Sequence, residues 1–371
     1  MTILLFDLSG QPHILLAVLR ALHREPGTVV HLLAEHPLQP VRFSRHGASY
    51  TTVTSASREE SIVGQIERLI GQRGIDVILP SGVAATRFLS KYRRVLQELC
   101  AIAPVPDLAA LELARDKGRL STHMQSSGIP HPRTIVVREP SEAIGFFDSL
   151  GGPALMKPLL SAGGRGFIRF DRREILERWS QGTEAPEDYL LQEFIPGHDI
   201  DCSVLSHHGT ILAHTVQRGT QGGIRSYAAP AAVEFIYHQG AFEIASMLAG
   251  SLRWSGVAHI DMRYDERDGT VKVLELNPRY WRSLLGSTTV GVNFPYLACL
   301  YALRGRFDPP ASSPGRYVHE TRAALRQMLR QRGRKHPYRF TETVLGESSR
   351  DPLPELALLL FHRLLPQARE G

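Results

Sequence analysis

The chain of 371 residues has few cysteines and no long hydrophobic run. Cys100, Cys202 and Cys299 are odd in number and widely spaced, which indicates buried thiols in a reducing compartment and neither a disulfide framework nor a zinc site. The apolar run at 356–361 is far shorter than the ~18 residues that span a bilayer. The N-terminus lacks a basic leader and carries Asp7, so it predicts a first strand and no signal peptide. We therefore expect a cytoplasmic protein without a transmembrane segment.

An excess of positive charge is also absent from most of the chain. Residues 301–371 hold 13 Lys+Arg against 7 Asp+Glu, which accounts for the whole net charge of +6 and leaves the preceding 300 residues neutral. This balance argues against nucleic-acid binding by the main body. The sequence has no G-x-G-x-x-G fingerprint and no Gly-Lys-Ser/Thr, which disfavours a dinucleotide site and a Walker A loop.

The hydrophobic pattern predicts an α/β fold. Apolar strands are expected at 2–8, 29–35 and 75–80, and helical spacing separates them, as in a parallel sheet covered on both faces. We expect an α/β domain over 1–105, a second domain over 106–310 and a basic helical extension over 311–371. The second domain should divide into lobes at about 106–190 and 191–310.

The segment 254–283 predicts a β-hairpin, because two apolar runs flank a polar turn. Asp261 and Glu275 are equidistant from position 268, so we expect them to face each other. Strand alternation adds Asn277 to the same face and directs Leu274 and Leu276 into a core. Two carboxylates and an amide oxygen favour Mg²⁺ or Mn²⁺.

Two arginines follow this hairpin directly. Arg279 and Arg282 would place positive charge beside the metal, which suggests phosphate chemistry. The alternative is a hairpin whose acids lie on a solvated face, and with Asp261 in register we favour the metal.

Three further segments have ambiguous meanings when each is taken alone. Lys157 near a strand end precedes Gly163, Gly164 and Gly166, which fits either a phosphate cradle or a flexible hairpin. The segment 192–199 fits either a strand end that reads a base or a solvated turn. Lys117 would alone be a solvated helix lysine.

Together, RDKGRL, ALMKPLLSAGGRG, LLQEFIPGHDIDCSVL and GVAHIDMRYDERDGTVKVLELNPRYW resemble the ATP-grasp superfamily in its carboxylate–amine ligase branch. The resemblance covers about residues 1–310. It implies an N-terminal Rossmann-like pre-ATP-grasp domain, followed by an ATP-grasp domain whose two α+β lobes clamp ATP.

The resemblance also implies a role for each motif residue. Lys117 and Lys157 would contact phosphates, and the three glycines would close over them. Gln192, Glu193 and Ile195 would read adenine, and Asp199 would bind ribose with a shorter arm than the glutamate common in relatives. Asp261, Glu275 and Asn277 would hold two Mg²⁺ ions, and Arg279 would contact the transferred phosphate.

Such an enzyme converts a small carboxylic acid to an acyl phosphate and passes the acyl group to an amine. We see no convincing Ser-His-Asp or Cys-His set. Arg218, Arg225 and Arg282 are candidates for binding the substrate carboxylate, with a lid expected at 217–230. The alternatives are a thiol or hydroxyl acceptor and a regulatory module that binds nucleotide without turnover.

The role of the C-terminal extension stays open at this stage. Arg322, Arg326 and Arg330 form one helical stripe, which fits either a solvated face or a site for an acidic partner. The sequence also leaves open a homodimer.

Overall fold

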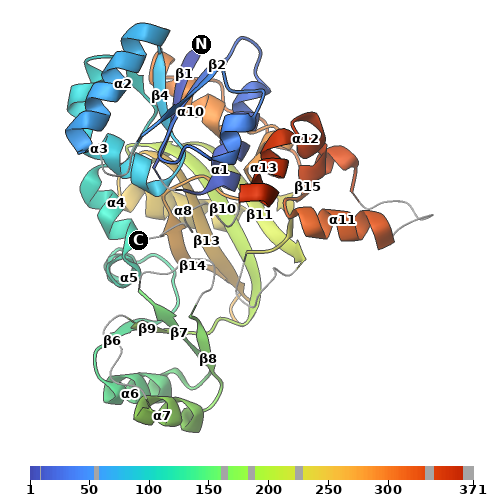
Figure 1. The fold of residues 1–371 in the computed structure, drawn as a ribbon. Coiled ribbons are helices and arrows are strands. Elements are labelled where there is room, and N and C mark those ends of the chain that lie inside the picture. The colour runs from blue at the N-terminus through green and yellow to red at the C-terminus, as the bar shows by residue number, and fades with distance from the viewer. Residues whose placement is uncertain are drawn as a thin grey trace.

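The computed structural model describes residues 1–8, 10–53, 58–159, 166–182, 189–221, 229–330 and 338–361. In these ranges the chain forms a parallel sheet, a small antiparallel sheet and a large antiparallel sheet (Figure 1). The mixture of α/β and α+β parts confirms the predicted fold class. In the described ranges, no helix has both the length and the apolar character that a bilayer crossing requires.

The first sheet is parallel, with strand order β3-β2-β1-β4-β5. Its strands are β1 (Thr2–Asp7), β2 (Val29–Ala34), β3 (Ser49–Thr52), β4 (Val77–Pro80) and β5 (Ala101–Ile102). Helix α1 (Pro12–His23) covers one face, while α2 (Glu59–Arg73) and α3 (Val83–Gln97) cover the other. The sequence predicts β1, β2 and β4, and it misses the two edge strands because β3 is polar and β5 has two residues.

The small sheet projects from the body as a separate lobe (Figure 1). Its order is β6-β9-β7-β8, with every described pair antiparallel. The strands are β6 (Thr134–Val137), β7 (Ala154–Pro158), β8 (Ile168–Phe170) and β9 (Tyr189–Glu193). Helices α6 (Pro140–Leu150) and α7 (Arg173–Gly182) pack on it around Phe147, Phe170 and Leu191. Helices α4 (Leu108–Arg115) and α5 (Lys117–Ser126) precede this lobe.

The large sheet has the order β14-β13-β10-β11-β12-β15. Its strands are β10 (Gly197–His207), β11 (Thr210–Gln221), β12 (Ala232–Ile236), β13 (Gly256–Asp265), β14 (Thr270–Asn277) and β15 (Gly315–Val318). Helix α8 (Gln239–Ser251) packs on one face. The sequence predicts a loop at 217–230, but the first residues of that range still belong to β11 and pair with β10 and β12.

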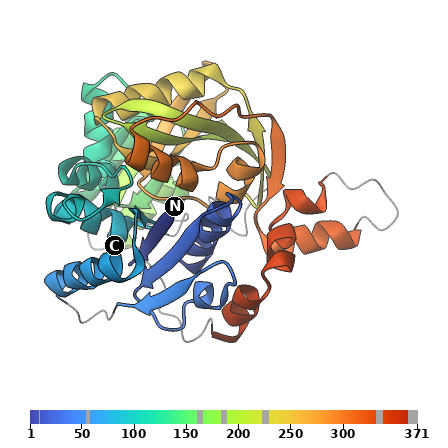
Figure 2. The same ribbon diagram turned by 90° about the horizontal axis from the view of Figure 1, so that it is seen from above.

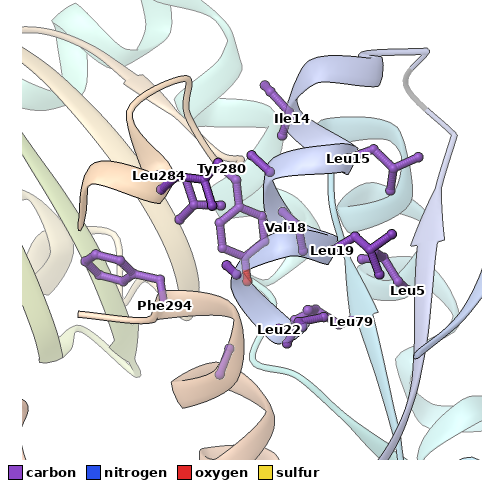
Figure 3. Packing of buried hydrophobic residues seen from close by; sticks show 14 of the residues in the cluster. Leu5, Ile14, Leu15, Val18, Leu19, Leu22, Leu79, Tyr280, Leu284 and Phe294 are labelled. Carbon is purple, nitrogen blue, oxygen red and sulfur yellow. The ribbon is translucent and has the colours of Figure 1, made fainter. Parts of the chain in front are cut away.

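The other face of the large sheet shares a core with the N-terminal domain. Tyr280 and Leu284 from the segment after β14 lie against Ile14 and Val18 of α1 (Figure 3). Helices α9 (Leu284–Thr289) and α10 (Phe294–Arg304) belong to the same contact region. This core fixes the start of α1 near the end of the β13–β14 hairpin.

The C-terminal extension is mainly helical, as the sequence predicts, and it also contributes one strand in its described part. Strand β15 adds a sixth strand to the large sheet by pairing with β12. After it come α11 (Thr321–Arg330), the short 3-10 helix η2 (Phe340–Glu342), α12 (Val344–Arg350) and α13 (Leu353–Phe361). Figure 2 shows the last helices beside the N-terminal domain, where α13 packs on the 3-10 helix η1 (Pro40–Phe43).

Candidate nucleotide and metal site

The β13–β14 hairpin brings the predicted metal ligands together. Asp261 pairs with Glu275 across the two strands, and His259 pairs with Asn277. The Nδ2 group of Asn277 donates to Asp261 and to Glu275, each at 3.2 Å. Leu276 lies in the core below, as predicted, whereas Leu274 is only partly buried at a register shift.

The local electrostatics favour positive charge beside this group. Burial, Glu275 and Asp201 all raise the pKa of Asp261 well above its ordinary value. Burial also acts to raise the pKa of Glu275, but nearby Lys117 and Lys157 outweigh it and hold that pKa below its ordinary value. Two carboxylates and one amide oxygen in a small volume are a donor set that suits Mg²⁺ or Mn²⁺.

Two lysines from other elements approach the same carboxylates. Lys117 opens α5, and its Nζ lies 3.6 Å from Glu275 Oε2. Lys157 on β7 is buried and donates to Gln192 Oε1 at 2.5 Å. Burial lowers the pKa of Lys157 to about 8, against the opposing effect of Glu275. The small lobe and the large sheet therefore each contribute charge to one site.

The segment between β9 and β10 is held by one arginine. Arg263 on β13 donates to the carbonyls of Ile195, at 2.5 Å, and Gly197, at 2.6 Å. It also binds the Asp199 carboxylate at 2.5 Å. Glu193 at the end of β9 pairs with Arg267 instead. Two of the groups predicted to meet the nucleotide, Ile195 and Asp199, thus share a single cationic partner.

The glycine loop is only partly visible. Gly163 and Gly164 lie outside the described residues. Gly166 has a φ of +74°, and a Cβ atom there would meet Pro158 Cγ at 2.9 Å. Both observations favour glycine at position 166.

The predicted arginines fall in different places. Arg279 donates to Asn277 Oδ1 at 3.4 Å and therefore borders the metal ligands. Arg218 does not border the metal ligands. This position corrects its predicted role in binding the substrate carboxylate. Its neighbour Gln217 hydrogen-bonds Asp201 on the site face, so Arg218 must point to the opposite face, where it pairs with Glu234. Arg225 lies outside the described residues, and Arg282 is exposed close to α1.

Sequence reasoning missed three polar residues on the site face. Asp201 Oδ2 accepts from Gln217 at 3.2 Å, and burial raises the Asp201 pKa to about 7. His259 Nε2 lies 3.3 Å from Asp261 Oδ1, and burial lowers the His259 pKa to about 3. Strand alternation could have placed two of them on the site face, because Asp201 follows Asp199 by two residues and His259 precedes Asp261 by two.

Comparisons with known proteins agree with this geometry. Residues 185–324 match the family model described as ATP-grasp in the biosynthetic pathway with Ter operon. D-aspartate ligase of Enterococcus faecium is 24% identical over 303 residues, which cover 74% of this chain and 70% of that protein. The chain spans half or less of the carbamoyl phosphate synthase chains that it also matches.

Solved structures share the fold at low sequence identity. N5-carboxyaminoimidazole synthetase from Staphylococcus aureus, solved with ADP, has a TM-score of 0.66 at 15% identity, over 90% of this chain and 86% of that one. L-amino acid ligase from Bacillus licheniformis has a TM-score of 0.59 at 17% identity, over 84% and 75%. Residues 185–324 are thus similar to an ATP-grasp family, and the described chain shares its fold with the L-amino acid ligase and the N5-carboxyaminoimidazole synthetase.

Proposed function

We propose that the protein activates a small carboxylic acid with ATP and joins it to an amine, releasing ADP and phosphate. One observation carries the proposal: Lys117 of α5 lies 3.6 Å from Glu275, and Lys157 of the small lobe adds a second positive charge beside the Asp261–Glu275 pair. This arrangement suits a triphosphate whose charge is met from both sides.

The proposed reaction has two steps. An oxygen of the substrate carboxylate attacks the γ-phosphorus of ATP, the bond to the β-phosphate oxygen breaks, and an acyl phosphate and ADP result. The amine nitrogen then attacks the acyl carbon, phosphate leaves, and the amine loses a proton as the amide forms. This route needs no nucleophilic side chain, which agrees with the absence of a recognisable catalytic triad from the sequence.

Each site residue then has a defined task. Lys117 and Lys157 neutralise phosphate oxygens, and Arg279 stabilises charge on the transferred group. The segment 192–195 contacts the base, and Asp199 contacts the ribose. Gly166, with Gly163 and Gly164, closes over the phosphates.

Asp261, Glu275 and Asn277 would hold Mg²⁺ or Mn²⁺, and we propose two ions. Metal bound there would neutralise charge that develops on the phosphate oxygens. The cytoplasm is the proposed location, which fits three cysteines that form no disulfide in the described structure.

The test measures ADP release with Mg²⁺ against a matrix of carboxylic acids and amines. ADP release that requires both partners and is lost in Glu275→Ala supports the ligase. Release with acid alone, together with hydroxylamine trapping of the acyl group, supports the acyl phosphate and directs the search to a thiol or hydroxyl acceptor. Confirmed ATP binding without turnover on any pair would reject the proposal in favour of a regulatory module.

A further inference from the structure

The side chains of Ser203 and His259 form a row that ends at Asp261, and the reaction described above gives neither of them a task. Strands β10 and β13 lie side by side, and their register pairs Ser203 with His259 (Figure 1). The Oγ atom of Ser203 lies 2.9 Å from His259 Nδ1. On the other side of the ring, Nε2 lies 3.3 Å from Asp261 Oδ1. One imidazole therefore connects a buried hydroxyl to a predicted metal ligand.

The orientation of the His259 ring is set from two sides. The ring stacks on Trp281, with centroids 5.4 Å apart and an interplanar angle of 14°. Both Trp281 and Ser203 are buried. Because Trp281 fixes the plane of the ring and Ser203 contacts Nδ1, the Nε2 atom is kept on the side of Asp261.

Serine, histidine and aspartate are also the residue types of a nucleophilic triad, but burial excludes that role here. Ser203 is 0% exposed, so a substrate carbonyl cannot reach its hydroxyl. Asp261 is the accessible end of the row, with its side chain 33% exposed. The geometry therefore favours an action of the row on the Asp261 carboxylate.

Hydrogen-bond chemistry gives the row a direction. A carboxylate oxygen can only accept, so a hydrogen atom between His259 and Asp261 has to be carried by Nε2. In a neutral ring Nδ1 then accepts from the Ser203 hydroxyl. The row thus needs no positive charge on the imidazole, and a neutral ring does not repel a cation at Asp261.

The neighbouring carboxylate of Asp201 has a donor of its own. Its Oδ2 atom lies 3.9 Å from His259 Nε2, which is too far for a hydrogen bond. It accepts instead from Gln217 at 3.2 Å, and Ser283 donates to Gln217 at 2.6 Å. These three side chains are buried. The Nε2 hydrogen of His259 is therefore left for Asp261.

The two oxygens of Asp261 face different partners. Oδ1 faces His259, whereas Oδ2 accepts from Asn277 Nδ2 at 3.2 Å and so lies on the side of the other metal ligands. A donor at Oδ1 would leave Oδ2 as the single oxygen for a cation. Mg²⁺ demands a compact octahedral site, whereas the larger shell of Ca²⁺ often includes both oxygens of a carboxylate.

We propose that His259, supported by Ser203, is a positioning residue that makes Asp261 bind the metal through one oxygen, so that the site prefers Mg²⁺ or Mn²⁺ over Ca²⁺. The proposal rests on the metal role that the proposed function gives to Asp261. Partners of metal ligands commonly change metal affinity by about tenfold to a hundredfold when they are mutated.

The test measures cation binding in the presence of ADP and needs no turnover. Free Mn²⁺ is followed by electron paramagnetic resonance, and Ca²⁺ is measured by its competition with Mn²⁺. His259→Phe keeps a ring against Trp281 and removes the Nε2 donor. We expect the Kd for Mn²⁺ to rise about tenfold or more and the Kd for Ca²⁺ to rise less, so that the preference for Mn²⁺ falls about fivefold or more. Ser203→Ala should change the preference in the same direction by a smaller factor.

Two further variants separate positioning from packing. His259→Gln can place an amide donor near the position of Nε2, so it should restore most of the Mn²⁺ affinity and preference. His214→Phe on β11 is the matched control, because His214 contacts Phe242 of α8 on the opposite face of the sheet, with ring centroids 4.3 Å apart. It should behave as the native chain. Equal losses in His259→Phe and His259→Gln would show that the ring only fills space, and would overturn the proposal.

Glu275→Gln distinguishes a failure of this proposal from a failure of the proposed metal site. Weak Mn²⁺ binding in Glu275→Gln together with a native preference in His259→Phe would reject the role of His259 and retain the metal site. Native Mn²⁺ affinity in Glu275→Gln would reject both, because the cation would then bind away from the hairpin.

Discussion

Asp261 and Glu275 face each other because β14 contains one residue more than regular pairing with β13 requires. Next to the turn, Met262 pairs with Val273, and one step further Asp261 pairs with Glu275, so Leu274 is left over. Strict alternation from the buried Val273 would direct Glu275 to the core face. The bulge reverses that phase and places Glu275 on the face that carries Asp261.

Loss of the Glu275 carboxylate should remove metal binding while the fold persists. In Glu275→Gln we expect Mn²⁺ affinity in the presence of ADP to fall about a hundredfold, because a charged ligand becomes neutral. Electron paramagnetic resonance of free Mn²⁺ measures this directly. The matched control is Glu266→Gln in the turn, where the carboxylate is 64% exposed. Native Mn²⁺ affinity in Glu275→Gln would show that the metal binds elsewhere.

The sequence predicts the hairpin and its acidic pair, although the reason differs from the one that the structure shows. Symmetry about position 268 pairs Asp261 with Glu275, yet the strands near the turn pair one residue out of that symmetry, as Asp265 with Thr270. The bulge at Leu274 restores the pairing. A single sequence does not reveal a bulge made by leucine, which is why the predicted core position of Leu274 is wrong.

Long-range placement was harder to predict than local pattern. Lys117 and Lys157 could be connected to Glu275 only through the family resemblance, since they lie on separate elements. The sequence predicts a loop around Arg218, whereas the structure has a strand there that directs the Arg218 side chain away from the site. The role of Arg263 depends on backbone carbonyls, which carry no sequence signal.

Lys157 should be needed for ATP affinity. Lys157→Met keeps the length of the side chain and its apolar packing while it removes the buried charge next to Gln192. We expect the Kd for ATP, measured by calorimetry, to rise about tenfold to a hundredfold from the loss of a charge-assisted contact. Lys91→Met on the surface of α3 removes an ordinary ion pair and should not change the Kd. An unchanged Kd in Lys157→Met would argue against phosphate contact.

Arg263 should stabilise the connection between the small lobe and the large sheet. Arg263→Met removes its hydrogen bonds to Ile195, Gly197 and Asp199. We expect the free energy of unfolding to fall by about 1–3 kcal/mol. Amide exchange over 194–199 should rise more than exchange in β1, and denaturant titration with hydrogen exchange measures both. Uniform acceleration in both segments would indicate a general effect on stability.

Arg20 should hold the C-terminal helices on the N-terminal domain. Its guanidinium is 2% exposed, contacts the Asp351 carbonyl at 2.9 Å and lies 3.7 Å from the Asp351 carboxylate. Arg20→Met leaves a buried carboxylate without its cation, which should cost about 3 kcal/mol in denaturant titration. Limited proteolysis should then cut first between 338 and 361. The control is Arg68→Met, at an exposed position of α2. Equal resistance of the two variants to the protease would show that Arg20 does not hold the C-terminal helices in place.

His46 should make stability fall in mild acid. Its side chain is 6% exposed, lies 4.0 Å from Asp351 and stacks on His23. Burial, followed by His23, lowers the folded-state pKa of His46 from 6.5 to about 4. The unfolded chain therefore binds the proton first, and stability contributed by neutral His46 is lost as the pH falls from about 6.5 to about 4. His46→Gln should reduce the loss of unfolding free energy over that range in denaturant titrations, whereas His198→Gln at the exposed start of β10 should retain it. Identical pH profiles for the native chain and His46→Gln would exclude this imidazole as a source of acid sensitivity.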